Sequence, residues 1–332
     1  MIKSFFFISL LFLINCDFKS SAGGIENQIN VVVSFEDLPK IKSLIDSIFS
    51  KGVLTPELEP YFNINYISAT DFNKVKYLHH ILIVSILEIP DTTADKLVKN
   101  FLPNKNNQLN TTNNLFSKRD FFAKEQVFSV AFANNINDFK NSIKLNGEWL
   151  FNKHLSFYIE QKEKHLFNKR EQFDLSRQLL KKYNWNIRIQ HDYTVIKEDS
   201  LNNFIWLGRA FPFRWLSVSW IDYDSASIFE NLDIDQQLHD YSKYYNNEII
   251  FLSKYRHSSI DKIVNFDALK VQGLWEHNKD VKGGPFISYF FYDKFLKKLF
   301  HFNLLVHNPG RKKLPSLLQL EIMVKTFSSK IL

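Results

Sequence analysis

Cys16, the only cysteine in the chain, carries the clearest chemical signal in the sequence. It follows the tripeptide Leu13-Ile14-Asn15 in the order typical of a bacterial lipobox, whose cysteine thiol receives a diacylglyceryl group through a thioether bond. The almost entirely apolar residues 5–14 are too few for a membrane span, which needs about 20 residues. We therefore expect a signal peptide over residues 1–15 and a lipidated tether over residues 16–28.

Two other interpretations of this segment stay open. It is also compatible with an ordinary secretory signal, or with a core segment that carries a buried cysteine. With one cysteine the chain has no disulfide framework and no cysteine-ligated zinc site. An exported domain of this kind depends on packing alone for its stability.

The charge balance bears on the choice of partner. The chain has 42 Lys and Arg against 35 Asp and Glu, a formal net charge of +7. This excess is compatible with anionic lipid headgroups or another envelope polyanion as a partner. The basic residues are dispersed, however, apart from Lys181-Lys182 and Arg311-Lys312-Lys313, and no basic stripe alternates with aromatic residues. We therefore expect a solvated basic surface and no nucleic-acid partner.

Sequence patterns for nucleophilic or metal-dependent catalysis are absent. There is no G-x-S-x-G elbow and no H-E-x-x-H pair. His154 and His165 would lie about 16 Å apart on a continuous helix, too far to share one metal ion. We expect no metal and no cofactor. Glu276 and Asp280 could act as an acid and a base, but nothing in their spacing distinguishes that role from a polar loop.

Segment 273–293 stands out because a tryptophan beside a charged pair is followed by a Gly-Gly-Pro turn and a dense aromatic strand. In a structural interpretation, one of the two glycines takes a positive φ in a tight turn and the proline starts the next strand. The alternative is an aromatic groove with polar groups at its mouth. The structural interpretation is favoured. The residues of this candidate groove or turn are Trp275, Glu276, Gly283, Gly284, Pro285, Tyr289 and Glu321.

Glu321 belongs to this set because it lies at the margin of an apolar stripe on the helix expected over residues 314–327. A partly buried carboxylate there needs a partner, since an unpaired buried charge is costly. Backbone amides of the Gly283-Gly284 turn or a nearby basic side chain could supply that partner.

Apolar periodicity predicts an α+β fold, with a mainly antiparallel sheet and helices packed on it. Two strand–helix units, which begin near residues 29 and 126, look like similar halves, although their sequence similarity is too weak to define a repeat. A hairpin and a helix end the chain. The expected strands cover residues 29–35, 63–67, 80–87, 126–133, 185–190, 204–208, 214–221, 285–293 and 299–307, and the expected helices about 36–51, 71–77, 138–182, 234–253 and 314–327.

A polar stretch divides the chain. The asparagine-rich residues 103–114 have almost nothing to bury, which indicates a loop or linker. We therefore expect an N-terminal α/β subdomain over residues 29–100, a polar loop or linker over residues 101–118, and a C-terminal α+β subdomain over residues 119–328.

Several short motifs of the chain follow one pattern, most specifically at the C-terminal end. They are Gly273-Leu274-Trp275-Glu276, residues 283–289, His307-Asn308-Pro309-Gly310, Lys312-Lys313 and Leu318-Gln319-Leu320-Glu321, with weaker matches at residues 72–73, 81–84 and 203–207. This pattern resembles that of the Bacteroidetes-type lipoproteins of domain-of-unknown-function family 4837, and the resemblance covers residues 28–328. The chain departs from the family pattern at residues 220–223 and 254–259. The family has no assigned activity, so the resemblance implies a location and a fold but no mechanism.

The expected function is that of a lipid-anchored cell-envelope protein with a non-enzymatic binding or structural role. A periplasmic hydrolase that acts on cell-wall material is the alternative, and a transport or assembly accessory is a third candidate. Acidic residues just after the lipobox cysteine are the usual cue for surface display in such bacteria. Past Asp17 they are nearly absent from the tether, so we expect the domain to face the periplasm. Its partners would be the membrane, through Cys16, and an envelope protein or polyanion. The sequence leaves open which membrane holds the anchor.

Three tripeptides resemble the O-glycosylation signal of the same bacteria. They are Asp91-Thr92-Thr93, Asp199-Ser200-Leu201 and Asp224-Ser225-Ala226, and matches this short often arise by chance.

Overall fold

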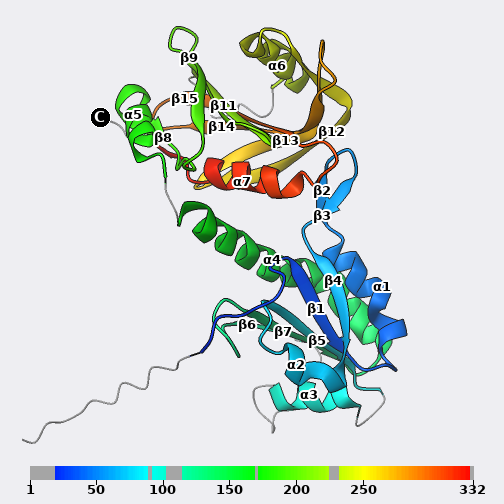
Figure 1. Cartoon of the computed structure of the whole chain (residues 1–332). Coiled ribbons are helices and arrows are strands. Elements are labelled where there is room, and N and C mark those ends of the chain that lie inside the picture. The colour runs from blue at the N-terminus through cyan, green and yellow to red at the C-terminus, as the bar shows by residue number, and fades with distance from the viewer. Residues whose placement is uncertain (1–18, 89–91, 102–113, 169–170, 224–231, 330–332) are drawn as a thin grey trace, which may run out of the picture. The chain divides into compact units, whose positions relative to one another are not determined.

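The computed structural model describes residues 19–88, 92–101, 114–168, 171–223 and 232–329 (Figure 1). Cys16 with the signal segment, Asp91, Asp224-Ser225-Ala226 and most of the expected linker lie outside the described residues. Contacts divide the chain into two units, each built from two separate stretches of sequence. The N-terminal unit is Met1–Leu38 with Asn65–Phe139, and the C-terminal unit is Pro39–Ile64 with Lys140–Leu332.

A five-stranded sheet in the order β4-β1-β5-β7-β6 forms the centre of the N-terminal unit. Its middle strands β1, β5 and β7 run parallel, and β6 pairs antiparallel with β7. Nearly every residue of the three parallel strands is buried, as expected for the largely apolar strands of a parallel sheet. The strands are β1 (Gln28–Val33), β4 (Asn63–Ser68), β5 (His80–Ile86), β6 (Leu115–Arg119) and β7 (Val127–Ala133).

Two short helices, α2 (Phe72–Val75) and α3 (Thr93–Phe101), pack on one face of this sheet. Ala94 and Val98 of α3 enter the same apolar cluster as Ile81 and Phe128 of the strands. The expected antiparallel arrangement does not hold for this sheet. Both strand–helix units contribute to it, because β1 and β7 flank β5.

The C-terminal unit contains a seven-stranded antiparallel sheet in the order β12-β13-β14-β15-β11-β10-β9, which confirms the α+β class with a large antiparallel sheet. Its strands are β9 (Thr194–Asp199), β10 (Phe204–Arg209), β11 (Phe213–Asp222), β12 (Ile249–Ile263), β13 (Phe266–His277), β14 (Gly283–Asp293) and β15 (Lys298–His307).

Helices lie on both faces of this sheet (Figure 1). Helix α7 (Leu314–Val324) covers one face, and α6 (Ile234–Tyr241) with the 3₁₀ turn η3 (Ser242–Tyr245) covers the other. The α7 face is rich in phenylalanine, and Phe327 contacts the rings of Phe300 and Phe302. The remaining elements of the unit are α1 (Leu38–Phe49), β2 (Gly52–Leu54), β3 (Leu58–Pro60), α4 (Ile136–Phe167), α5 (Phe173–Tyr183), β8 (Trp185–Asn186) and β16 (Ser328–Ser329).

The first turn of α7 is capped by a residue distant in sequence. The Glu59 carboxylate, at the β2–β3 hairpin, accepts hydrogen bonds from the backbone N–H groups of Lys313 and Leu314 at 2.9–3.0 Å. A carboxylate here satisfies free N–H groups and lies at the positive end of the helix dipole.

Two expected helices end earlier than their apolar periodicity indicates. The helix expected over residues 138–182 is divided into α4 and α5, and Gln172 bonds through its side chain to the carbonyls of His191 and Tyr193. The helix expected over residues 234–253 stops at η3, where Asn246 and Asn247 take positive φ values of 57° and 59°. The chain then enters β12, an exposed edge strand whose polar residues show no strand period.

The α6 face buries both an aromatic ring and an imidazole. Trp275 is 1% exposed and belongs to the apolar cluster with Phe286 and Phe290. His301 lies between the rings of Tyr241 and Phe290, each 4.0 Å away between ring centroids. Its Nε2 is 3.0 Å from the Ser288 hydroxyl.

Replacement of Trp275 by alanine should destabilise the protein by about 3–5 kcal/mol, because it leaves a cavity in the core. Urea unfolding of the full chain measures this. Trp149→Ala, at a position 40% exposed on α4, is the matched control and should cost much less. Equal unfolding midpoints for Trp275→Ala and the wild type would contradict the buried position.

Acid should destabilise the protein through its buried imidazoles. Burial lowers the pKa of both His154 and His301 from 6.5 to about 3. The unfolded chain therefore binds more protons than the folded chain between these values, so stability present above pH 6.5 is lost as the pH falls toward 3. Each histidine should lower the free energy of unfolding by about 2 kcal/mol between pH 7 and pH 5.

His301→Asn should remove one of these two contributions, so the pH dependence of urea unfolding should weaken. The exposed His257→Asn variant is the control and should retain the wild-type dependence. An unchanged dependence in His301→Asn would show that this ring is protonated without cost in the folded state.

Candidate functional site

The residues singled out in the C-terminal sequence block come together on β13, β14 and α7. Trp275 points into the α6 face of the sheet, where its ring centroid is 5.7 Å from that of Trp215. Its indole Nε1 is buried and has no hydrogen-bond partner within the described part of the chain. The ring is therefore a core residue and does not line a groove.

Gly283 and Gly284 begin β14, and the structure corrects the conformation expected for them. Neither takes a positive φ, because both are paired in the sheet opposite Glu276 and Trp275. Glycine is required for space: a Cβ on Gly284 would come within 2.0 Å of the Val306 carbonyl oxygen. Pro285 precedes the first β14–β15 pair, so its missing N–H removes no bond of that ladder.

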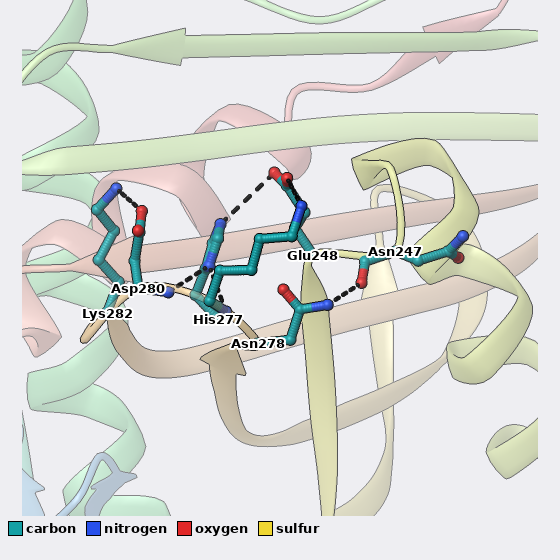
Figure 2. A network of polar contacts seen from close by, with 7 residues as sticks. Asn247, Glu248, His277, Asn278, Asp280 and Lys282 are labelled. Atoms are coloured by element: carbon teal, nitrogen blue, oxygen red, sulfur yellow. Dashed lines mark hydrogen bonds and ion pairs between the residues drawn. The ribbon is translucent and has the colours of Figure 1, made fainter.

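The turn before Gly283 is held by a polar network, which we call the turn network: Glu248, His277, Asn278, Lys279, Asp280 and Lys282 (Figure 2). His277 Nδ1 accepts hydrogen bonds from the backbone N–H groups of Lys279 and Asp280 at 3.2 and 3.0 Å. In a neutral ring the proton is then on Nε2, which lies 3.6 Å from the Glu248 carboxylate.

The carboxylates of the turn network are paired with lysines. Glu248 lies 3.1 Å from the Lys279 ammonium, and this hydrogen bond lowers the pKa of Glu248. Lys282 donates to Asp280 at 2.5 Å and lowers the pKa of Asp280. Neither group is suited to act as a general acid near neutral pH. Glu276 is exposed on β13 and is not hydrogen-bonded to Asp280, whose carboxylate is bonded to Lys282.

A second group of charges lies on the α7 face, and we call it the buried ion-pair network: Asp261, Lys270, Tyr289, Glu321 and Lys325. Glu321 of α7 is only 5% exposed. It accepts a hydrogen bond from the Lys270 ammonium at 2.5 Å and another from the Tyr289 hydroxyl at 2.5 Å. Lys270 and Tyr289 are cross-strand partners on β13 and β14, which places both beneath the helix.

Tyr289 also connects Glu321 to a second carboxylate. Its hydroxyl lies 3.2 Å from Asp261 of β12, which in turn lies 3.2 Å from the Lys325 ammonium. Burial alone would raise the pKa of Asp261, but Lys325 and the Lys262 backbone N–H lower it more. Burial, and then Glu321 and Asp261, raise the pKa of Tyr289 well above its usual value. The phenol therefore stays protonated and donates its single hydrogen to one of the two carboxylates.

Sequence reasoning identified Glu321 and Tyr289 but missed Asp261, Lys270 and Lys325. Of the two partners expected for Glu321, the basic side chain is the one observed, since Lys270 supplies the charge and the Gly283-Gly284 turn does not. Lys270 lies on β13 and Asp261 on β12, two strands whose polar residues gave no strand period. A lysine 51 residues before a buried glutamate carries no local signal of contact.

The C-terminal unit also has an open hollow of about 640 Å³ between α6 and the start of β12. Its charged residues, Asp235 and Arg256, form an ion pair with each other. Among the described residues no group of three or more His, Cys, Asp or Glu side chains could hold a metal ion. No helix in the described ranges is long and apolar enough to cross a membrane.

Two tripeptides with a glycosylation-like pattern fall at least partly within the described residues. The Thr92 hydroxyl accepts a hydrogen bond from the Asp95 backbone N–H at the start of α3. The Ser200 hydroxyl bonds to Lys182 and Tyr183. Both hydroxyls therefore have structural roles on the unmodified chain.

The solved structures that match include two weak likenesses. One is to a crystal structure from Bacteroides thetaiotaomicron, with 10% identity, 45% of this chain covered and a TM-score of 0.27; the match spans 46% of that chain. The other is to a mutant of the protein Mog1, with 11% identity, 44% of this chain and 90% of that chain covered, and a TM-score of 0.29. Neither is close enough to support an argument. A comparison with curated proteins finds no match.

Two family models divide the chain between them. Residues 21–167 match the model described as Domain of unknown function (DUF8532). Residues 172–326 match Domain of unknown function (DUF4837), a narrower region than the expected 28–328. The second match contains every residue of the turn network and of the buried ion-pair network, so both networks lie in the region that is similar to DUF4837.

Proposed function

We propose that the chain is a lipid-anchored cell-envelope protein that acts without catalysis, by binding a partner or by supporting an envelope structure. The order of basic start, apolar run and lipobox before Cys16 supports the anchor. The near absence of acidic residues from the tether past Asp17 supports a position facing the periplasm. The membrane that holds the anchor and the identity of the partner are left open by this proposal.

The buried ion-pair network is the observation that carries the non-catalytic role. A glycoside hydrolase needs two carboxyl groups beside a cleft, one of them protonated near neutral pH so that it can act as the acid. Asp261 and Glu321 are close enough to share Tyr289, yet each is also bonded to a lysine. The fall in the pKa of Asp261 keeps that carboxylate ionised. This arrangement fits a structural link between α7 and the sheet better than a catalytic acid–base pair.

The first test concerns hydrolysis. Full-length protein incubated with purified peptidoglycan should release no soluble fragments above the level of a heat-unfolded sample. The Glu321→Gln variant, purified in the same way, should have a free energy of unfolding about 3–5 kcal/mol lower than the wild type, because the substitution leaves Lys270 buried without a charged partner.

The control for that substitution is Glu276→Gln. Glu276 is an exposed residue on β13, the strand that carries Lys270, and its replacement should change the free energy of unfolding little. Release of peptidoglycan fragments by the wild type, lost in Glu321→Gln but kept in Glu276→Gln, would support the hydrolase alternative and overturn the proposal.

The second test concerns the anchor. Wild-type protein should stay in the membrane fraction after a high-salt wash, because two or more acyl chains give stable binding where one chain gives only marginal binding. Cys16→Ser should be released, while Ser21→Ala in the tether should be retained. Retention of Cys16→Ser would show that the anchor is not on this residue, and removal of the domain from intact cells by protease would contradict a periplasmic position.

A further inference from the structure

Two arginines face each other where the β10–β11 hairpin closes. Arg209 ends β10, and its cross-strand partner on β11 is Arg214. Directly opposite residues of an antiparallel pair lie on the same face of the sheet, here the face covered by α7. Like charges in this position repel each other unless a negative charge lies nearby. We use the name arginine cluster for Arg209 and Arg214 together with Asp192 and Tyr193, which precede β9.

The charges of the arginine cluster do not balance. Arg209 forms an ion pair with Asp192 at 2.5 Å. Arg214 is 9% exposed and donates to the side chain of Gln319 on α7, which is neutral. Burial, and then the positive charge of Arg209, lower the pKa of Arg214. Two guanidinium groups and one carboxylate leave one positive charge uncompensated in a largely buried place.

Three hydrogen-bond donors of the arginine cluster also have no partner. Within the described residues, Arg209 Nε, Arg214 Nε and the Tyr193 hydroxyl are buried without a partner. Tyr193 is 0% exposed, and it lies near enough to both arginines for their charges to act on its pKa, which burial raises above its usual value. The cluster has one unpartnered acceptor, Asp192 Oδ1, so unpartnered donors outnumber acceptors three to one.

We propose that the arginine cluster binds a small monovalent anion, either chloride or a carboxylate group. An anion accepts hydrogen bonds from all three donors and cancels the remaining positive charge, which a water molecule cannot do. Guanidinium N–H groups match a carboxylate well, and a monovalent ion brings the cluster to neutrality. Asp192 and Arg209, whose side chains are 28% and 23% exposed, provide the side from which solvent ions enter. This ligand site lies in the region that is similar to DUF4837 and is independent of the lipid anchor and of the buried ion-pair network.

The test measures chloride directly, by the ³⁵Cl NMR line width of sodium chloride solutions that contain the full-length protein. The wild type should broaden the line, and sodium acetate should reverse the broadening if a carboxylate occupies the same place. Tyr193→Phe removes one donor without changing the charge and should reduce the broadening at least two-fold. Arg214→Gln should abolish it. The matched control is Arg177→Gln, since Arg177 is 75% exposed and paired with Asp174, and it should leave the broadening unchanged.

Thermal melts of each variant show whether it is folded. Should Arg214→Gln fail to fold, Tyr193→Phe decides the matter, because it deletes only a hydroxyl that has no partner. Competition by acetate assigns the site to carboxylates as well as chloride, and absence of competition restricts it to chloride; either result supports an anion site. Equal broadening by the wild type, Tyr193→Phe and Arg177→Gln would mean that water alone fills the cluster, and the proposal would be wrong.

Discussion

The buried carboxylate of Glu321 is the constraint on which the C-terminal sheet depends. A charge this deep in the protein must be paired, and both of its partners come from strands beneath the helix. Lys270 on β13 and Tyr289 on β14 can reach it only when the two strands are in their observed register. One ion pair therefore fixes the position of α7 and the alignment of two strands together. The same requirement explains why a glutamate is placed within an otherwise apolar helix.

The two faces of the seven-stranded sheet use buried polar groups in different ways. On the α7 face the groups of the buried ion-pair network are charged and paired. On the α6 face they are neutral: the Ser217 hydroxyl bonds to Tyr241 and Tyr245, and Tyr245 donates to Asn303. The low pKa of His301 keeps that face neutral down to acidic pH. In both of these groups the polar side chains fix the orientation of a helix on the sheet through hydrogen bonds or ion pairs within the protein.

The sequence predicts those elements whose large apolar residues follow a simple period. Phe300, Phe302, Leu304 and Val306 alternate along β15, and the Gly283-Gly284-Pro285 run marks the start of β14, so the C-terminal hairpin is found where it is expected. Strand β12 could not be predicted, because only its two end residues are buried and a strand exposed on both faces needs no apolar alternation. Because neither β12 nor β13 was predicted as a strand, the sequence could not place Lys270 and Asp261 near Glu321. The burial of the carboxylate could be inferred from its own helix, but its neighbours depend on a strand order that local patterns do not contain.

The capping of α7 by Glu59 bears on how this protein can be divided into fragments. The family match begins at residue 172, and a fragment cut there would contain the whole seven-stranded sheet. It would nevertheless lack residues 39–64, which belong to the same unit and supply the cap. The last helix would then begin with unsatisfied N–H groups, directly before the turns that carry Glu321. The boundary given by the family match therefore differs from the boundary given by hydrogen bonds. A fragment that keeps the fold has to include residues 39–64 as well.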